Sequence, residues 1–333
     1  MAERSAYPPS HDDSAVVAVD IGGTTIKGAA FAPHGSVLER ATVPTFGPAG
    51  SPLEATSGLI AQLDAAIRAG GRRLTGIGVA SPGLVDSVRG TVTFAANLGW
   101  TDMAIVDLLT ERFGVPVALE HDGRAAARAE RVARIAAGRD GDEFVFVPIG
   151  TGISAAIVTG GVVVTGATGG AGEFGHVPVV PDGELCTCGQ RGCVEVYASA
   201  SAIVRRYRAA GGTLPGGARE ITAAASTDPV AASVWADAVD ALAVGLTGLA
   251  AVLDPSALVI GGGLGEAGDR LLVPLREGVA RRLAWRSAPR VEQSLVGAGA
   301  GLIGASLLLE SPLVPGDTVT PPAPVPVPSK EPS

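Results

Sequence analysis

The sequence predicts two α/β domains whose loops face a common cleft. A chain of 333 residues is long enough for two domains, and with 47% hydrophobic residues each domain can bury a core. Segments typical of strands alternate with helical patterns in two successive sets, and each set opens on a short apolar strand followed by glycines. Because open α/β sheets bind ligands beyond the ends of their strands, these glycine turns indicate where the site lies.

The first set begins with a sheet and continues with alternating helices and strands. We expect strands over 15–20, 26–32, 36–43, 74–80 and 115–120, and helices over 52–69, 102–113 and 123–137. The first three strands are joined by tight turns, which predicts an antiparallel arrangement. Apolar residues at helical spacing support the helix over 52–69.

The second set follows the same alternation. We expect strands over 143–149, 155–164 and 257–260, and helices over 199–210, 229–253 and 301–310. The long apolar stretch over 234–253 is interrupted by Asp237 and Asp240, so it predicts a buried or amphipathic helix and not a membrane span. We therefore expect no transmembrane segment.

Charge and composition narrow the class of protein. The net charge is −8, and no stripe of Lys and Arg is available to neutralise a phosphate backbone, so nucleic acid is not an expected partner. Residues 1–13 are polar and lack the apolar region of a secretory signal, which predicts a flexible N-terminus and a cytoplasmic location. Beyond Ser311 the sequence is rich in proline, which predicts a disordered tail over 312–333.

The string D-I-G-G-T-T-I-K lies at the turn of the first predicted hairpin. Its candidate phosphate-contact residues are Asp20, Gly22, Gly23, Thr24, Thr25 and Lys27. A hairpin turn is not the strand-to-helix context of a Walker A loop or a dinucleotide fingerprint. Glycines let backbone N–H groups approach phosphate oxygens, Thr24 adds a hydroxyl donor, and Asp20 can help to hold a hydrated magnesium ion. An ordinary glycine hairpin turn is the alternative.

Two further glycine turns follow apolar strands. Thr151 and Gly152, after Gly150, form a second candidate phosphate contact that would face the first turn across the cleft. Gly262 and Gly263 follow the strand over 257–260 and leave room for an adenine and a ribose to lie against the backbone. A plain strand-to-helix turn is the alternative for this last segment.

Asp122 is the candidate catalytic residue. It follows the buried strand over 115–120, where open α/β sheets place reactive side chains. A sugar hydroxyl is a weak nucleophile, so phosphoryl transfer to it needs a carboxylate that accepts its proton. Asp122 can also act as the N-cap of the helix that begins at Gly123, and the two roles do not exclude each other.

The three cysteines of the chain predict a metal site. Cys186, Cys188 and Cys193 fall within eight residues in the string C-T-C-G-Q-R-G-C, after His176. One imidazole and three thiolates complete a closed tetrahedral zinc site, which leaves no position for a reactive water. We therefore expect a structural zinc ion; cysteines packed as small hydrophobic residues are the alternative.

Polar residues on both sides of the cysteine loop are candidates for binding a sugar. Glu173 and His176 lie in G-E-F-G-H, and Glu195 follows the last cysteine. A loop organised by an ion can present two carboxylates and an imidazole edge to adjacent hydroxyl groups. Asn97 to Trp100 would add an amide and an aromatic wall, although a loop tryptophan packed in the core explains Trp100 equally well.

These motifs resemble those of the ROK family, which includes bacterial glucokinases, other hexose and N-acetylhexosamine kinases, and sugar-responsive repressors. The resemblance covers about Val16 to Glu310. Its most specific parts are G-E-F-G-H, C-T-C-G-Q-R-G-C-V-E and D-I-G-G-T-T-I-K, in the family's order. The chain as a whole is most similar to ATP-dependent glucokinases of bacteria with high G+C content.

The resemblance implies an actin-like, ribonuclease-H-like pair of domains with ATP and magnesium between them. We expect a smaller domain over 14–122 plus 300–311, and a larger domain over 123–299 that carries the zinc loop. Asp122 matches the catalytic base. The positions that hold the sugar match Gly83, Asn97, Glu173, His176 and Glu195, and His176 also ligates zinc. Asp20, Thr24 and Thr151 match phosphate contacts, and the region of Gly262 matches the nucleoside site.

One departure concerns the residues around the base. The family usually reads E-N-D-A where this chain reads Glu120, His121, Asp122 and Gly123. The asparagine normally touches the sugar; His121 can still form one hydrogen bond, but it is bulkier and changes charge near neutral pH. His121 therefore stays a sugar-binding candidate, and it bears on which sugar is accepted.

Several readings of the function stay open at this point. The leading one is ATP-dependent phosphorylation of glucose; mannose, fructose, N-acetylglucosamine or N-acetylmannosamine are alternative acceptors, and polyphosphate is an alternative donor. A non-catalytic sugar-binding protein is possible because of His121. A repressor is disfavoured, because the dozen residues before the first strand are too few for a helix-turn-helix domain. The resemblance further implies a homodimer or homotetramer.

Overall fold

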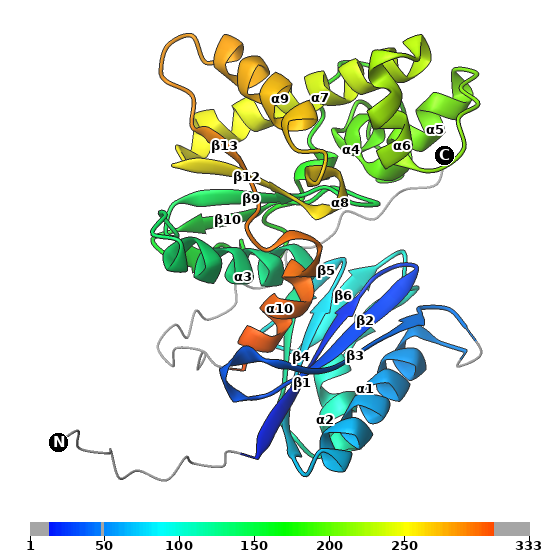
Figure 1. Cartoon of the computed structure of the whole chain (residues 1–333), viewed down its shortest axis with the longest axis vertical. Helices are drawn as coiled ribbons and strands as arrows, with labels where there is room; N and C mark the ends of the chain where they lie inside the picture. Colours follow the sequence, from blue (N-terminus) through cyan, green and yellow to red (C-terminus); the bar gives the residue numbers. More distant parts are fainter. Residues whose placement is uncertain (1–12, 48–49, 310–333) are drawn as a thin grey trace, which may run out of the picture.

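Two units are stacked in the computed structural model, which describes residues 13–47 and 50–309, and each unit is built around a five-stranded sheet (Figure 1). Both sheets have the same plan. Three strands at one side are antiparallel, and two strands at the other side run parallel to the central one. The predicted pair of α/β sets is confirmed.

The strand that opens each unit is the central strand of its sheet. The first sheet has the order β3-β2-β1-β4-β8 and the second β11-β10-β9-β12-β13. The strands of the first are β1 (Ser14–Ile21), β2 (Thr25–Phe31), β3 (Val37–Pro44), β4 (Arg73–Ser81) and β8 (Val117–His121); those of the second are β9 (Phe144–Pro148), β10 (Ala156–Thr159), β11 (Val162–Val163), β12 (Ala257–Gly261) and β13 (Arg290–Gln293). Each central strand therefore carries its glycine turn to the middle of the molecule.

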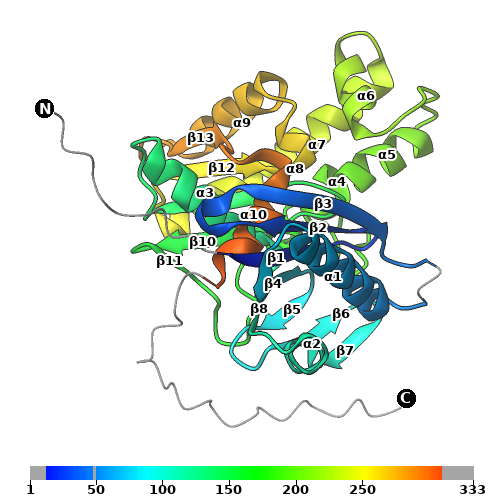
Figure 2. The same cartoon turned by 60° about the horizontal axis from the view of Figure 1, so that its bottom comes forward.

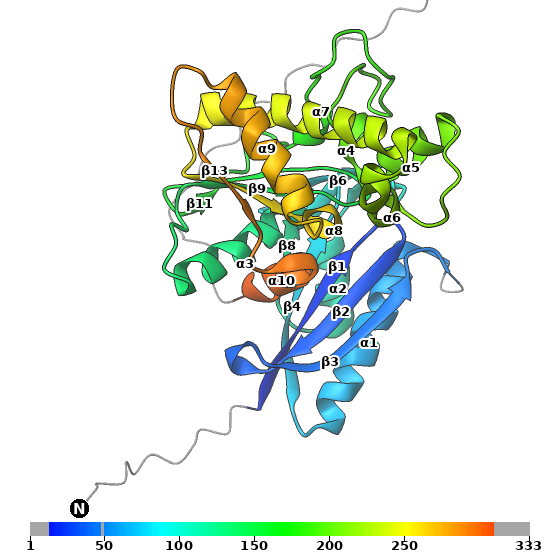
Figure 3. The same cartoon turned by 45° about the horizontal axis from the view of Figure 1, so that its top comes forward.

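Helices cover both faces of both sheets. The helices are α1 (Pro52–Ala69), α2 (Ile105–Phe113), α3 (Asp122–Ala136), α4 (Glu195–Ala198), α5 (Ala200–Ala209), α6 (Ala218–Ala223), α7 (Pro229–Leu253), α8 (Gly262–Gly265), α9 (Asp269–Arg282) and α10 (Ala300–Leu307). Helix α1 packs on the outer face of the first sheet, and α7 and α9 lie together on the outer face of the second (Figure 3). Helices α3 and α10 lie between the two sheets (Figure 1).

The alternation of side chains along β1 decides which way Asp20 points. Val17 and Val19 face the core under α1, whereas Ala18 belongs to the cluster under α10. Because side chains of a strand alternate between faces, Asp20 lies on the same side as Ala18. A Cβ built on Gly301, in the first turn of α10, would lie 2.9 Å from Asp20 Oδ2, which places this carboxylate beside the start of α10.

The contact of α10 with its neighbours is very close, because small residues line it. A Cβ on Gly304 would lie 1.8 Å from the carbonyl oxygen of Ala125 in α3, and one on Gly78 of β4 would lie 1.9 Å from that of Ala305. Real Cβ atoms do not approach an oxygen so closely. The packing of α10 between α3 and β4 thus requires glycine at both positions.

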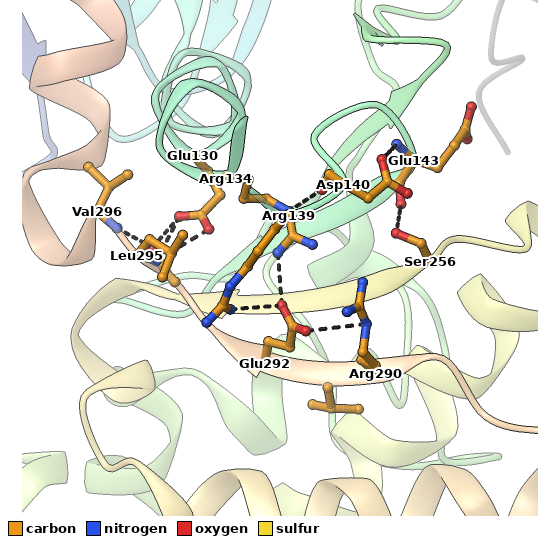
Figure 4. Close-up of polar contacts among 12 residues, drawn as sticks. Glu130, Arg134, Arg139, Asp140, Glu143, Ser256, Arg290, Glu292, Leu295 and Val296 are labelled. Atoms are coloured by element: carbon orange, nitrogen blue, oxygen red, sulfur yellow. Dashed lines mark hydrogen bonds and ion pairs between the residues drawn. The ribbon is translucent and has the colours of Figure 1, made fainter. Parts of the chain in front are cut away.

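Polar contacts hold the other end of α3 to the second unit (Figure 4). The buried Glu130 carboxylate accepts hydrogen bonds from the Leu295 N–H (3.0 Å) and the Ser294 hydroxyl (2.8 Å). Arg134, fully buried, donates to Glu292 of β13 at 2.9 Å, and Arg139 binds the same carboxylate. Helix α3 is therefore fixed to the segment that leads from β13 into α10.

A small three-stranded sheet that was not predicted follows β4. Strands β5 (Leu84–Asp86), β6 (Thr91–Ala95) and β7 (Trp100–Met103) pair in antiparallel order and lie next to α2 (Figure 2). The predicted start of a helix at residue 102 is wrong. Asp102 has φ of 47°, a left-handed conformation that interrupts a helix, so α2 begins at Ile105.

Other differences lie in the second unit. The strand expected over 155–164 is a hairpin of β10 and β11, because Gly160 and Gly161 both have positive φ and turn the chain. Helices α6 and α9 and strand β13 were not predicted. Helix α9 contains Pro274, which weakens the pattern of an uninterrupted helix.

Among the described residues, α7 is the one helix long and apolar enough to cross a membrane by length and composition. Its buried side, including Val234, Leu242 and Leu246, belongs to the core of the second unit. The two aspartates that interrupt its apolar run form ion pairs, Asp237 with Arg206 and Asp240 with Arg282. These contacts agree with the expected interior helix.

Two of the sequence expectations fall largely outside the described residues. The tail predicted over 312–333 lies outside them entirely. The flexible N-terminus predicted over 1–13 lies outside them apart from Asp13, which binds Arg73. The domain division at residue 122 stays a prediction, since α3, which begins there, contacts both units.

A glycine substitution tests the packing of α10. We expect Gly304→Ala to lower the free energy of unfolding by about 1–3 kcal/mol, because the new methyl group forces the backbones of α3 and α10 apart. The matched control is Gly248→Ala in the exposed part of α7, where a Cβ meets nothing within 4 Å; it should raise stability by about 0.5–1 kcal/mol. Denaturant titration measures the free energy of unfolding of both variants. A Gly304→Ala variant with the stability of the wild type would contradict the close contact.

Candidate active site

Asp122 lies where β8 ends and α3 begins, between the two units. It is the first residue of α3, and the N-cap is His121, whose Nδ1 accepts the Gly123 N–H at 3.2 Å. The hypothesis that Asp122 itself is the N-cap is therefore corrected by one residue. The Gly123 N–H is shared with Asp122 Oδ1 at 2.5 Å, and the Asp122 side chain keeps 40% of its surface exposed at the site.

The first glycine turn joins β1 to β2 next to Asp20. The Gly22 N–H donates to the Thr25 carbonyl at 3.0 Å, and the hydroxyl of Thr45 fixes the Gly22 carbonyl at 2.6 Å. Thr24 and Thr25 are exposed, so they are free to meet a ligand. Lys27 pairs with Asp20 across the hairpin.

The electrostatics of Asp20 and Asp122 are linked. Burial raises the pKa of Asp20 from its ordinary value of 3.8 to about 6; the Asp122 carboxylate adds to the rise, and Lys27 opposes it. A carboxylate that raises the pKa of its neighbour favours a bound cation between the two. The pair fits a hydrated divalent ion held near the first glycine turn.

The second glycine turn lies opposite, between β9 and β10. Gly150 and Gly152 close the turn, and Thr151 at its tip is exposed. The N–H of Ile153 donates to Glu195 Oε2 at 2.8 Å, and a Cβ on Gly152 would lie 2.7 Å from that oxygen. This turn is thus joined directly to a sugar-binding candidate.

A cavity of about 610 Å³ opens beside the second turn. Its lining is Gly150, Thr151, Ala200, Gly217, Ala218, Arg219, Glu220, Thr222, Gly263, Leu264, Glu266, Ala267 and Arg270. Gly263 lines it, as the nucleoside prediction requires. Gly262 does not: it has φ of 72°, and a Cβ there would lie 2.4 Å from the Ile149 carbonyl oxygen, so its glycine serves the strand-to-helix turn.

The four predicted metal ligands come together. Their ligand atoms all lie within 4.8 Å of one another; His176 Nδ1 is 3.6 Å from Cys186 Sγ, and Cys188 Sγ is 3.7 Å from Cys193 Sγ. Ligands at about 2.0–2.3 Å from a tetrahedral zinc ion lie roughly 3.3–3.8 Å apart, so the cluster fits a closed tetrahedral site. Gly189 and Gly192, both with positive φ, bend the loop around it.

The metal cluster orients His176 toward the sugar candidates. While Nδ1 faces the cysteines, Nε2 lies 4.0 Å from Glu173 Oε2. Glu195 begins α4, and a Cβ on Gly175 of G-E-F-G-H would lie 3.2 Å from its Oε2. Glu173, His176 and Glu195 thus gather on one loop system beside the second turn.

Gly83 and Asn97 lie on the small sheet of the first unit. Gly83 has φ of 91°, and a Cβ there would lie 2.2 Å from the Phe94 carbonyl oxygen, so only glycine fits. The Asn97 side chain lies next to Gly23, since a Cβ built on Gly23 would be 3.1 Å from Asn97 Nδ2. Trp100 is 4% exposed in the core of the first unit, so it provides no aromatic wall.

A buried arginine that the sequence did not single out connects the parts of this site. Arg124, 1% exposed, donates to Glu120 Oε1 at 2.7 Å, to the Val85 carbonyl at 3.2 Å and to the Gly169 carbonyl at 2.8 Å. It therefore joins the start of α3, the small sheet and the loop that leads to Glu173. Two of its three partners, Val85 and Gly169, are distant in sequence, so no local pattern marks it.

Two units of the same plan, with a glycine turn after the central strand of each sheet and Asp122 between the units, define the actin-like class of two-domain sugar kinases. Solved structures share this fold. A ROK family glucokinase from Streptomyces griseus in complex with glucose and AMPPNP superposes with a TM-score of 0.76 at 34% identity, over 88% of this chain and 98% of that one. The ROK hexokinase from Thermus thermophilus gives 0.72 at 32% identity, over 89% and 98%.

The sequence leads to the same group. A glucokinase of Streptomyces coelicolor is 34% identical over 316 residues, which span 89% of this chain and 98% of the relative. Residues 16–311 match the ROK family. The chain belongs to the ROK family, as its motifs predicted.

The raised pKa of Asp20 predicts a pH-dependent gain of stability in Asp20→Asn. Because the folded-state pKa lies above the unfolded value, wild-type stability falls as pH rises from about 4 to 6, when the buried carboxyl must ionise. Asparagine has no carboxyl group to ionise, so the variant does not lose this stability as the pH rises. We expect the variant to melt a few degrees above the wild type at pH 8 without magnesium, with a smaller gain at pH 5.

Thermal unfolding at the two pH values measures this, with Asp13→Asn as control, because Asp13 is an exposed carboxylate just before β1 that pairs with Arg73. A gain that is equal at both pH values, or greater at pH 5, would contradict the raised pKa.

Proposed function

We propose that this chain transfers the γ-phosphoryl group of ATP to a hexose, with glucose as the preferred acceptor and glucose 6-phosphate as the product. The observation that carries the proposal is the partly exposed carboxylate of Asp122 at the start of α3, the helix that contacts both units. The glucokinases among its relatives support the choice of glucose.

Asp122 acts as the general base. Its Oδ1 accepts the Gly123 N–H, and within the described residues its Oδ2 has no hydrogen-bond partner, so Oδ2 is available for the proton of the attacking sugar hydroxyl. Asp20 would hold the hydrated magnesium ion that accompanies ATP and neutralises charge on the phosphates. The backbone of Gly22 and Gly23 and the hydroxyl groups of Thr24 and Thr151 would contact phosphate oxygens.

The cavity beside the second turn supports a nucleotide as the donor. Ala200, Ala218 and Leu264 give it an apolar lining suited to adenine. Glu220 and Glu266 also line it together with Arg219 and Arg270, so its charge is balanced and gives a chain of inorganic phosphates no particular attraction. An ion pair of Arg219 with Glu266, at 2.9 Å, lies at this cavity.

The sugar would bind between Asn97 of the first unit and Glu173, His176 and Glu195 of the second. Closure of the two units would then bring the sugar hydroxyl to Asp122 and exclude water. Another hexose or an N-acetylhexosamine is the alternative acceptor. A non-catalytic sugar-binding role is disfavoured, because Asp20, Asp122 and both glycine turns are present.

The cluster of His176, Cys186, Cys188 and Cys193 would hold a structural zinc ion. Zinc would fix the loop and the tautomer of His176, so that Nε2 faces the sugar. We further propose a cytoplasmic homodimer or homotetramer, on the resemblance to other members of the family.

The substitution Asp122→Asn tests the proposal. The amide keeps the shape of the side chain but cannot take a proton, so we expect kcat to fall by about 10²–10⁴-fold while glucose still binds. A coupled assay of ADP release, with ATP, magnesium and a panel of glucose, mannose, fructose, N-acetylglucosamine and N-acetylmannosamine, measures turnover. Calorimetry measures binding. Full activity of the variant would remove Asp122 as the base.

Removal of the metal should affect both stability and sugar affinity. We expect one zinc ion per chain by elemental analysis, and a lower Tm with a raised KM for sugar in Cys188→Ser, because the loop with Glu173 and His176 loses its anchor. Thr187→Ala, at the exposed residue between two cysteines, is the matched control and should leave zinc content unchanged. Active wild-type protein without zinc would contradict this role.

A further inference from the structure

We propose that His121 is a positioning residue that fixes the carboxylate of Asp122, and that it does not contact the sugar. This inference rests on the proposed kinase function, since it assigns a task toward the base of that reaction. It changes the expectation that His121 takes part in sugar binding. The contacts of the imidazole ring decide between the two roles.

Both ring nitrogens of His121 are occupied by groups of the protein. Nδ1 accepts the backbone N–H of Gly123 at 3.2 Å. A backbone N–H can only donate, so Nδ1 carries no proton and the neutral ring carries its proton on Nε2. Nε2 lies 3.3 Å from Asp122 Oδ1, which places the imidazole beside the carboxylate of the base.

These contacts leave the ring no donor or acceptor for a sugar hydroxyl. The side chain of His121 is 8% exposed, whereas that of Asp122 is 40% exposed. The Gly123 N–H donates to Asp122 Oδ1, and the imidazole lies beside the same oxygen, so the rotation of the carboxylate is fixed. Oδ2 is then held toward the site in the orientation that the proton transfer needs.

The space around the ring shows that His121 and Gly123 form a matched pair. A Cβ on Gly123 would lie 3.3 Å from Cε1 and 3.4 Å from Nδ1 of His121, and 2.8 Å from Ser154 Oγ. Ser154 belongs to the second unit and follows Ile153, the residue whose N–H is bound by Glu195. A side chain at 123 would therefore press on the imidazole of His121 as well as on Ser154.

The pairing of His121 with Gly123 accounts for both positions at which this chain differs from E-N-D-A. The residue at 121 is turned inward to the base, and the absent methyl group at 123 makes room for its ring. Recognition of the sugar is consequently left to Asn97, Glu173, His176 and Glu195. We therefore expect weaker discrimination between hexoses at the hydroxyl nearest to His121 than an outward-facing amide would give.

Substitutions of His121 separate positioning from sugar contact. His121→Asn keeps an acceptor for the Gly123 N–H but loses the donor to Asp122; we expect a Tm near that of the wild type, a fall in kcat of about 10-fold and a sugar KM within about twofold. His121→Gln places an amide near Nε2 and should recover part of kcat. A raised KM with unchanged kcat in His121→Asn would show a sugar contact and overturn the proposal.

A double-mutant cycle tests the pairing with Gly123. We expect Gly123→Ala to lower kcat at least 10-fold in a Ser154→Ala background, which removes the contact of the new methyl group with Ser154 Oγ, and to have little further effect when His121→Ala is present as well. Additive effects would contradict the matched pair.

Nitrogen NMR of the isotope-labelled imidazole detects the contact between His121 and Asp122 in the absence of turnover. The chain has four histidines, so assignment by substitution is practical. We expect His121 in the neutral form with its proton on Nε2, and a shift of the Nε2 resonance in Asp122→Asn. A proton on Nδ1 would overturn the proposal. A wild-type enzyme inactive on every sugar would contradict the proposed function alone, because this readout does not depend on it.

Discussion

The close packing of α10 against α3 and β4 is the contact on which the site depends. Gly304 and Gly78 let the backbones of these elements meet, and Glu130 fixes α3 to the segment before α10. Both helices begin at the cleft, α3 with Asp122 and α10 beside Asp20. The two carboxylates, from β1 and from the end of β8, are thereby brought close enough for one to raise the pKa of the other.

The sugar site depends on longer connections. Arg124 links the start of α3 with the carbonyls of Val85 and Gly169, and Glu195 links the zinc-binding loop with the N–H of Ile153. These buried contacts tie the small sheet, the base and the metal-binding loop together across both units. A change in the loop is therefore transmitted to the position of the sugar relative to Asp122.

Local patterns in the sequence were sufficient for much of the fold and the metal cluster. Helix α1 covers the predicted residues because Ser51 caps it and Pro52 begins it, and the four metal ligands were found from their spacing. The small sheet and α9 were missed, since short strands and a helix with Pro274 give weak periodicity. The task of Arg124 was missed because Val85 and Gly169 are brought to it by tertiary packing, and that of His121 because the sequence does not show which way its ring turns.

The account as a whole is tested most directly by phosphorus NMR of the reaction products. With ATP, magnesium and glucose, the wild-type protein should form ADP and a sugar phosphomonoester in equal amounts, with the new resonance split by the protons of a primary carbon. Free inorganic phosphate in place of the ester, or intact ATP with every hexose, would contradict a site in which Asp122 passes a phosphoryl group to a sugar.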